Sequence, residues 1–298
     1  MEFPPCHIHP PQTTHTHTAI LLHGRASNGA EFAEELFSSV TSNGQTLPDA
    51  LSTWRWVFPT SRDRLSTRFQ EEICSWFDAY SLTDIHERQE LQVDGLRESV
   101  AYILEILEEE IRLLDGKAHH VYLGGISQGM ATALWTLLCA GGGRINGRLG
   151  GVVGFCGWLP FAREMEEMTR RSGGASSGSD ESQIQRAVCN FCRETVGLAP
   201  VSERIVNSQG GVLPPSATPV LLGHGTDDDW VPVELGRQAL RVLKGLTGDV
   251  EWKEYAGAEG DGHWIKEPQG FDAILEFLER GSRAAEDTVT NACGLVAF

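Results

Sequence analysis

Short apolar runs alternate along this chain with longer stretches in which apolar residues recur every three or four positions. The clearest periodic stretch spans residues 88–114, with a run of glutamates on its other side, and it predicts an amphipathic helix. Its apolar positions are Leu96, Val100, Ile103, Leu107, Ile111 and Leu114. Further helices are predicted at 128–141, 233–246 and 270–281, and buried strands at 17–24, 54–60, 120–127, 147–160, 218–225 and 250–257. The alternation predicts an α/β protein with a mostly parallel central sheet and helices on both faces.

Two segments do not follow this alternation. Residues 163–217 form a long interval whose centre, residues 170–182, is rich in Gly and Ser. Loops of this length are uncommon in compact domains and often serve as lids or mobile insertions. We therefore expect a single domain over residues 1–281, with a lid or mobile insertion at 163–217. Residues 282–298 are expected to form a peripheral tail.

Composition narrows the class of partner. The 298 residues are 41% hydrophobic and 22% charged, which is ordinary for a globular protein, and the formal net charge is −17. Such a charge disfavours nucleic acid and anionic membranes. We see no apolar stretch long enough to cross a membrane and no secretory signal, so we expect no stable membrane insertion and a cytoplasmic location. The seven cysteines are then expected to be reduced thiols, and oligomeric state is not predicted.

A candidate nucleophile lies between the strand predicted at 120–127 and the helix predicted at 128–141. Residues 125–129 read Gly-Ile-Ser-Gln-Gly, a G-x-S-x-G pattern at a strand-to-helix turn. This is the setting of a nucleophile elbow, which exposes the serine hydroxyl and needs small neighbours. The alternative is a glycine-rich turn with an incidental serine. The context favours Ser127 as a nucleophile.

A serine nucleophile needs a base, and the base needs an orienting carboxylate. In α/β-hydrolases the chain order is Ser, then Asp or Glu, then His. His263 follows the last predicted strand on a glycine-rich loop, whereas His224 lies at a strand end and is expected to pack. The carboxylate should follow the strand at 218–225, where three consecutive acids occur: Asp227, Asp228 and Asp229. Residue order alone leaves open which of the three orients His263.

The motifs together resemble those of the acyl-protein thioesterase/lysophospholipase group of carboxylesterases, which are α/β-hydrolases. They read LLHG (21–24), SWFD (75–78), GGISQGM (124–130), CGWLP (156–160), HGTDDDWVP (224–232) and GHW (262–264), in family order. On the family pattern HG-x-x-D-x-x-V-P, the resemblance selects Asp228 as the triad acid, with Asp227 as the alternative. It also implies an oxyanion hole formed by the backbone N–H groups of Arg25 and Gln128. Two tryptophans within the shared motifs, Trp76 and Trp158, are expected to contact substrate.

The chain departs from this family at two places. Ala26 stands where the family usually has glycine, and His23 is expected to hold the same loop rather than transfer protons. The stretch 60–78, which lines the acyl channel in family members that remove long acyl chains, is crowded here with charges. Its arginines either pair with glutamates in a solvated loop or recognise an anionic group of the substrate. The candidates for substrate binding are Arg62, Arg64 and Arg68.

Metal and redox signals are weak. A histidine-rich stretch at 7–18 offers two imidazoles on one face without a third ligand, and an exposed strand edge explains it better. Cys189 and Cys192 form a lone C-x-x-C, which we interpret as two thiols in a helical region. We expect neither a metal nor another cofactor.

These observations predict a serine hydrolase that cleaves carboxylic esters or thioesters of a small molecule or an acylated substrate. Lysophospholipase-type action or transfer of the acyl group to another acceptor are alternatives, because the same triad serves both. A non-catalytic α/β-hydrolase that binds a ligand is the alternative of a different class.

Overall fold

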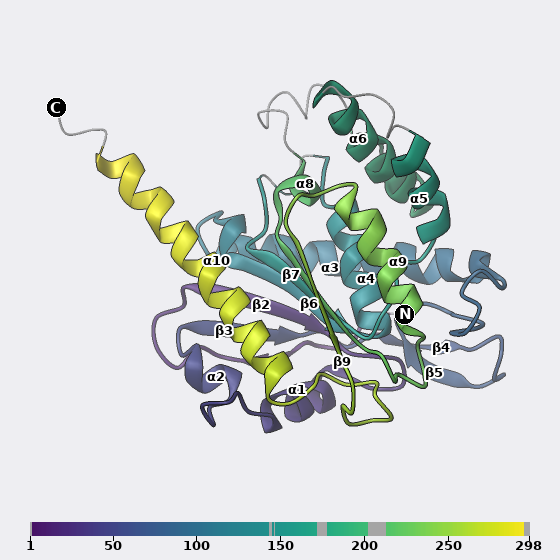
Figure 1. Cartoon of the computed structure of the whole chain (residues 1–298), viewed down its shortest axis with the longest axis horizontal. Helices are drawn as coiled ribbons and strands as arrows, with labels where there is room; N and C mark the ends of the chain where they lie inside the picture. The colour runs from purple at the N-terminus through teal and green to yellow at the C-terminus, as the bar shows by residue number, and fades with distance from the viewer. Residues whose placement is uncertain (1, 143–144, 146, 172–177, 202–212, 295–298) are drawn as a thin grey trace.

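The computed structural model describes residues 2–142, 145, 147–171, 178–201 and 213–294, and its centre is a seven-stranded sheet (Figure 1). The strand order is β1-β3-β2-β6-β7-β8-β9, with β1 antiparallel to β3 and every other neighbouring pair parallel. The strands are β1 (His7–His9), β2 (His17–Leu22), β3 (Trp54–Phe58), β6 (Val121–Ile126), β7 (Gly151–Phe155), β8 (Val220–Gly225) and β9 (Val250–Tyr255). The predicted mostly parallel sheet is therefore confirmed, and the histidine-rich stretch supplies its edge strand.

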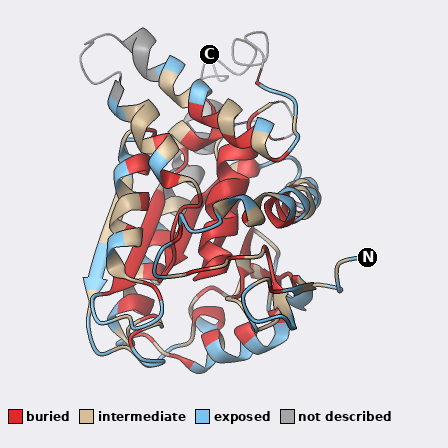
Figure 2. Cartoon of the chain, turned by 90° about the vertical axis from the view of Figure 1, so that its right-hand side faces the viewer, coloured by how far each residue is buried: buried red, intermediate tan, exposed pale blue. Residues whose placement is uncertain are grey.

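Helices cover both faces of the sheet (Figure 1). One face packs against α3 (Gln92–Leu113), α4 (Gln128–Cys139) and α9 (Val233–Lys244). The other packs against α1 (Gly29–Ser38), α2 (Leu47–Ala50) and α10 (Gln269–Gly294). Successive strand residues alternate between the two cores, since Leu222 joins the α3/α4 side and Leu221 the α1/α10 side. Both faces are buried over the central strands β2, β6, β7 and β8, which are nearly continuous apolar runs, whereas the edge strand β9 is intermediate or exposed (Figure 2).

The predicted amphipathic helix is α3, preceded by a short 3-10 turn, η1 (Gln89–Leu91). Four of its predicted core positions are fully buried: Leu96, Val100, Ile103 and Leu107. A second 3-10 turn, η2 (Ala118–His120), leads into β6. The last helix is longer than predicted, because α10 runs without interruption to Gly294 and projects past the sheet (Figure 1).

The 163–217 segment contains helices that its composition did not reveal. They are α5 (Ala162–Arg171), α6 (Gly178–Thr195) and α8 (Pro214–Ala217). Helix α6 packs against α4, and Val188 and Cys192 of α6 are fully buried in the main core. Residues 172–177 and 202–212 of the segment lie outside the described residues. A lid role for the segment stays a prediction.

The stretch 60–78 forms a two-stranded antiparallel hairpin, β4 (Arg62–Leu65) with β5 (Glu72–Ser75). The sequence predicted a loop here. Gln128 of α4 anchors the base of the hairpin. Its side-chain oxygen accepts from the backbone N–H of Trp76 at 2.9 Å, and its side-chain amide nitrogen donates to the Phe77 carbonyl at 2.6 Å. The start of α4 and the hairpin are therefore positioned together.

No helix in the described part of the chain has the length and apolarity needed to cross a membrane.

Candidate active site

The strand-to-helix turn after β6 holds Ser127 in an unusual backbone conformation. Its φ is 56° and its ψ −122°, which L-residues with a side chain rarely adopt. The neighbouring glycines are required by close approach, since a Cβ on Gly125 would lie 2.5 Å, and one on Gly129 2.1 Å, from the Leu22 carbonyl oxygen. The turn therefore has the geometry of a nucleophile elbow.

Asp228 and His263 come from the loops that follow β8 and β9, at the carboxyl edge of the sheet. Asp228 Oδ2 lies 2.7 Å from His263 Nδ1. The other carboxylate oxygen, Oδ1, accepts from the backbone N–H groups of Trp230 at 2.9 Å and Val231 at 2.8 Å. These contacts fix the carboxylate and leave Nε2 of His263 as the nitrogen that is not committed to Asp228.

His224 is a further partner of Asp228 that the sequence analysis did not assign. As expected it is fully buried, but its Nε2 lies 3.2 Å from Asp228 Oδ2 and 2.9 Å from the Val231 carbonyl oxygen. Burial by itself raises the pKa of Asp228, yet hydrogen bonds from His224, His263 and the Val231 N–H outweigh it and hold that pKa well below its usual range. Asp228 is therefore a carboxylate at any working pH.

The neighbouring acids have different surroundings. Asp227 is exposed and accepts from the Gly257 N–H at 2.8 Å, and Asp229 is exposed as well. Of the three consecutive aspartates, only Asp228 lies against His263. The choice of Asp228 over Asp227, which residue order left open, agrees with this geometry.

Ser127 and His263 line one pocket of about 350 Å³. Its other described lining residues are Gly24, Arg25, Ala26, Ser27, Phe32, Glu35, Leu82, Ile126, Trp230 and Trp264. Trp230 is 54% exposed at the rim. The sequence analysis missed Phe32, Leu82, Trp230 and Trp264. Two signals were available, because Trp230 follows the aspartate run and Trp264 follows His263 in the quoted motifs.

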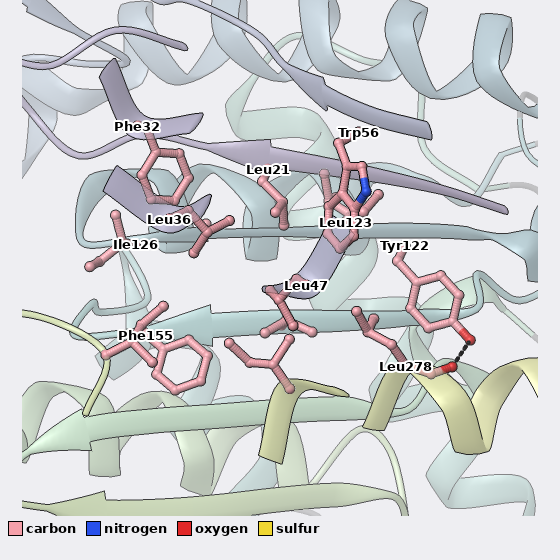
Figure 3. A pocket seen from close by; sticks show the side chains of 15 residues that line it. Leu21, Phe32, Leu36, Leu47, Trp56, Tyr122, Leu123, Ile126, Phe155 and Leu278 are labelled. Atoms are coloured by element: carbon pink, nitrogen blue, oxygen red, sulfur yellow. Dashed lines mark hydrogen bonds between the residues drawn. The ribbon is translucent and has the colours of Figure 1, made fainter. Parts of the chain in front are cut away.

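A second, apolar cavity lies behind this pocket, between the sheet and the helices α1, α2 and α10 (Figure 3). Phe32 and Ile126 line both spaces. The inner cavity holds about 30 Å³, close to the size of one water molecule, and its walls are almost entirely apolar. An acyl group bound at Ser127 must therefore lie in the outer pocket unless Phe32 or Ile126 moves.

The loop after β2 presents the backbone groups expected for an oxyanion hole. Among the described residues, the Arg25 N–H has no acceptor, whereas the next N–H, that of Ala26, donates to the Cys74 carbonyl at 2.8 Å. Gln128 is the first residue of α4, where N–H groups lack an intrahelical acceptor. Both N–H groups are thus available to a ligand at Ser127.

His23 holds this loop, as expected. Its Nε2 accepts from the Ser61 N–H at 3.0 Å, its Nδ1 contacts the Gly24 carbonyl at 2.6 Å, and its own carbonyl accepts from the Trp76 indole at 2.9 Å. Burial lowers the pKa of His23 to about 4, so the ring is neutral. Ala26 adopts φ 64°, the left-handed conformation that glycine adopts without strain.

Two predicted substrate contacts are wrong for the pocket that contains Ser127. Trp76 and Trp158 are at most 1% exposed and do not line it. Trp76 is held in the interior by its bond to His23, and Trp158 packs edge-on against Phe77 at 5.9 Å. Their indole rings pack in the hydrophobic core beneath the hairpin.

The three arginines of the hairpin region do not line the pocket either. Arg62 and Arg64 both pair with Glu98 of α3, the latter at 2.7 Å, and the Arg68 guanidinium lies 5.5 Å from the Tyr80 ring. The paired interpretation of Arg62 and Arg64 therefore holds, and the anion-recognition hypothesis fails for this pocket. Glu98 lies on a different element, so spacing within the hairpin did not reveal it.

One group of described residues could in principle hold a metal. Ligand atoms of Cys156, Asp228 and His263 lie within 4.8 Å of one another. Metal binding needs a thiolate, and burial raises the pKa of Cys156 to about 12. A metal would also have to displace the hydrogen bond between Asp228 and His263. The protonated thiol of Cys156 and the bond between Asp228 and His263 both argue against a metal at these three residues.

Comparison with known proteins assigns the family. Residues 5–175, more than half of the chain, match the model of a family described as phospholipase/carboxylesterase. This chain belongs to the phospholipase/carboxylesterase family. It is 25% identical over 278 residues to acyl-protein thioesterase 1 of Gibberella zeae, covering 92% of this chain and 94% of that protein. It is also 25% identical over 240 residues to carboxylesterase SOBER1 of Arabidopsis thaliana, covering 80% and 82%.

Solved structures from two plants share the fold. Acyl-protein thioesterase 2 of Zea mays superposes with a TM-score of 0.61 at 24% identity, over 94% of this chain and 99% of that one. SOBER1 of Arabidopsis thaliana superposes with a TM-score of 0.57 at 25% identity, over 89% and 99%. The chain is an α/β-hydrolase, and its family membership supports a hydrolase of carboxylic ester or thioester bonds.

Proposed function

We propose that the protein hydrolyses carboxylic esters or thioesters of short to medium acyl groups through an acyl-enzyme on Ser127. One observation carries this proposal: Ser127 and His263 line the same pocket, and His263 Nδ1 lies 2.7 Å from the buried carboxylate of Asp228. A proton on Nδ1, donated to Asp228, leaves Nε2 free to accept the proton of the serine hydroxyl. Asp228 holds the ring in this tautomer and stabilises the imidazolium that forms.

The first half of the reaction acylates the enzyme. Ser127 Oγ forms a bond to the substrate carbonyl carbon while its proton passes to His263 Nε2. Negative charge develops on the carbonyl oxygen, and the N–H groups of Arg25 and Gln128 donate to it. The bond to the leaving oxygen or sulfur then breaks, and His263 returns the proton to that group. The leaving group must therefore lie beside His263.

The second half releases the acid. His263 takes a proton from a water molecule, whose oxygen attacks the acyl-enzyme carbonyl. The bond to Ser127 Oγ breaks and His263 returns the proton to the serine. Each step needs only groups of this chain, the substrate and water.

Hydrolysis of 4-nitrophenyl esters from acetate to palmitate tests the proposal. Wild type should release nitrophenol, with a maximum at short or medium chains because the inner cavity is closed. Ser127→Ala should lower kcat at least about a thousandfold. A fluorophosphonate probe should label wild type on the peptide that contains Ser127.

Ser27→Ala provides a matched control, because it removes the other serine hydroxyl that lines the same pocket. Labelling should persist in this variant. Labelling that disappears with Ser27 but survives Ser127→Ala would contradict the assignment of the nucleophile. Wild type that neither turns over an ester nor reacts with the probe would instead support the binding-module alternative.

A further inference from the structure

The pocket around Ser127 contains a single basic side chain other than histidine among the described residues that line it, that of Arg25. The proposed mechanism uses only the backbone N–H of this residue. Its guanidinium carries five N–H donors and a full positive charge.

Arg25 differs from the hairpin arginines in its partners. Its guanidinium carbon lies 5.3 Å from the centre of the Phe69 ring, a cation–π contact that leaves the N–H donors unused. Within the described residues, no ion pair or hydrogen bond of the Arg25 side chain is found. Burial lowers the pKa of the Arg25 guanidinium. The negative charge of Asp78, which forms no ion pair with Arg25, partly opposes this lowering, and the positive charge of Arg68 adds to it.

An unpaired, partly desolvated guanidinium gains more from an acceptor than a solvated one does. A planar carboxylate matches its fork of donors with two parallel hydrogen bonds. The contact with Phe69 restricts the guanidinium and so reduces the side-chain entropy lost on binding. Arg25 is thus prepared for a carboxylate ligand.

The location of Arg25 indicates which part of the substrate carries that carboxylate. The leaving group lies beside His263, where an adjoining cavity of about 250 Å³ is lined by two acids, Glu35 and Glu259. Arg25 is absent from that cavity and stacks instead on Phe69, between β4 and β5. Glu35 also lines the pocket around Ser127, whereas Glu259 lines the cavity beside His263 and not that pocket, so an anionic group is favoured near Arg25, on the acyl side, and disfavoured beside Glu259.

We propose that the Arg25 guanidinium binds a carboxylate at the far end of the acyl group, so that the enzyme selects monoesters or monothioesters of short dicarboxylic acids. This inference rests on the proposed function. The formal charge of −17 slows the encounter with anions, but its effect at the site is screened beyond about 8 Å at physiological salt. The local guanidinium then decides the specificity.

A pair of esters of equal chain length tests this inference: mono-4-nitrophenyl glutarate and 4-nitrophenyl pentanoate. The readout is the ratio of their kcat/KM values, glutarate over pentanoate, with Ser127→Ala supplying the background rate. Wild type should show a ratio above one. Arg25→Met should lower the ratio about tenfold to a hundredfold, and Arg25→Lys less, because a lysine keeps the charge without the fork.

The ratio separates side-chain recognition from catalysis. Arg25→Met keeps the backbone N–H, and any disturbance of the oxyanion hole affects both esters. Arg68→Gln is the control for charge alone, because it removes a neighbouring positive charge that does not line the pocket, and it should change the ratio by less than about twofold. An effect of Arg68→Gln as large as that of Arg25→Met would overturn the inference.

A measurement on wild type keeps the inference testable if Arg25→Met does not fold. Glutarate should inhibit pentanoate hydrolysis competitively, and more strongly than butyrate does. A wild-type ratio at or below one, or equal inhibition by the two acids, overturns the role of Arg25. Wild type that hydrolyses neither ester and is not labelled by the fluorophosphonate overturns the proposed function as well, so the two failures are distinct.

Discussion

The Nε2 atom of His224 lies 3.2 Å from Oδ2 of Asp228, the same oxygen that contacts His263. Asp228, the proposed triad acid, is therefore held between two imidazoles, one fully buried and one facing the pocket. His224 touches no substrate in the proposed mechanism. In that mechanism it is a positioning residue that acts through Asp228.

Replacing His224 should reduce the rate without preventing substrate binding. His224→Leu removes a donor to the carboxylate, so Asp228 holds His263 less firmly, and we expect kcat to fall about tenfold to a hundredfold with little change in KM. His224→Gln offers an amide N–H near the position of Nε2 and should restore most of the rate. Steady-state kinetics on one ester distinguishes this from a purely structural role, in which both variants would lose activity in proportion to their stability.

The position of Asp228 shows how far sequence reasoning reaches. Chain order placed the acid after β8, and the family motif selected one of three adjacent aspartates. Each step depends on local sequence, because a strand end and its loop lie within a few residues of each other. The second imidazole on Asp228 was missed because a buried histidine at a strand end is compatible with simple packing.

Contacts between distant segments were not predictable in the same way. The pairing of the hairpin arginines with Glu98 joins residues more than 30 positions apart, and nothing in the local pattern of 60–78 identifies that partner. Helix α1 was not among the predicted helices, although Asn28 caps it and Phe32 and Leu36 lie on its buried face. Because this helix was not predicted, the contribution of Phe32 to the pocket wall was missed as well.

Phe32 separates the pocket from the inner apolar cavity, so a smaller side chain should lengthen the acyl group that fits. We expect Phe32→Leu to raise kcat/KM for octanoate relative to acetate about threefold to tenfold, because a few buried methylene contacts are worth this much. The measurement is the chain-length profile of 4-nitrophenyl esters.

Phe37→Leu is the matched control for this change. Phe37 lies on the same helix and packs against Trp56 and Phe58, but it does not line the pocket. Its chain-length profile should resemble that of wild type. A profile that shifts equally in both variants would show that loosening of α1, rather than access to the inner cavity, determines acyl length.

A stack of aromatic rings at the amino ends of the strands, opposite the pocket, predicts that the stability of the protein falls in acid. His17 is 4% exposed and lies between Trp54, at 4.9 Å, and His120, at 4.4 Å. Burial, with neighbouring His120, His119 and His15 adding to it, lowers the pKa of His17 to about 3. The unfolded chain has a histidine pKa near 6.5, so it binds more protons than the folded protein between these two values.

The contribution of neutral His17 to the free energy of unfolding is therefore complete above about pH 6.5 and is lost as the pH falls toward 3. At pH 5, His17 alone should reduce the free energy of unfolding by about 2 kcal/mol relative to pH 8. Urea unfolding of wild type and His17→Phe at both pH values measures this, and the variant should lose less stability on acidification. His86→Gln, at an exposed position, should retain the wild-type pH dependence, and a similar flattening there would refute the assignment.

Ala26 provides a test of backbone strain beside the proposed oxyanion hole. An alanine at φ 64° costs about 1 kcal/mol relative to a glycine, which adopts this conformation freely. Ala26→Gly should therefore raise the free energy of unfolding by up to about 1 kcal/mol, partly offset by the greater entropy of the unfolded chain. Because the Ala26 N–H still donates to Cys74, we expect the loop to keep its shape and kcat to stay within about threefold of wild type.

The same substitution in a helix should have the opposite sign. Ala30→Gly, at the exposed start of α1, should lower the free energy of unfolding by about 0.5–1 kcal/mol. Urea midpoints of the two variants give the comparison. If Ala26→Gly destabilises the protein as Ala30→Gly does, the left-handed conformation at Ala26 is not strained, and alanine at this position has no energetic cost relative to glycine.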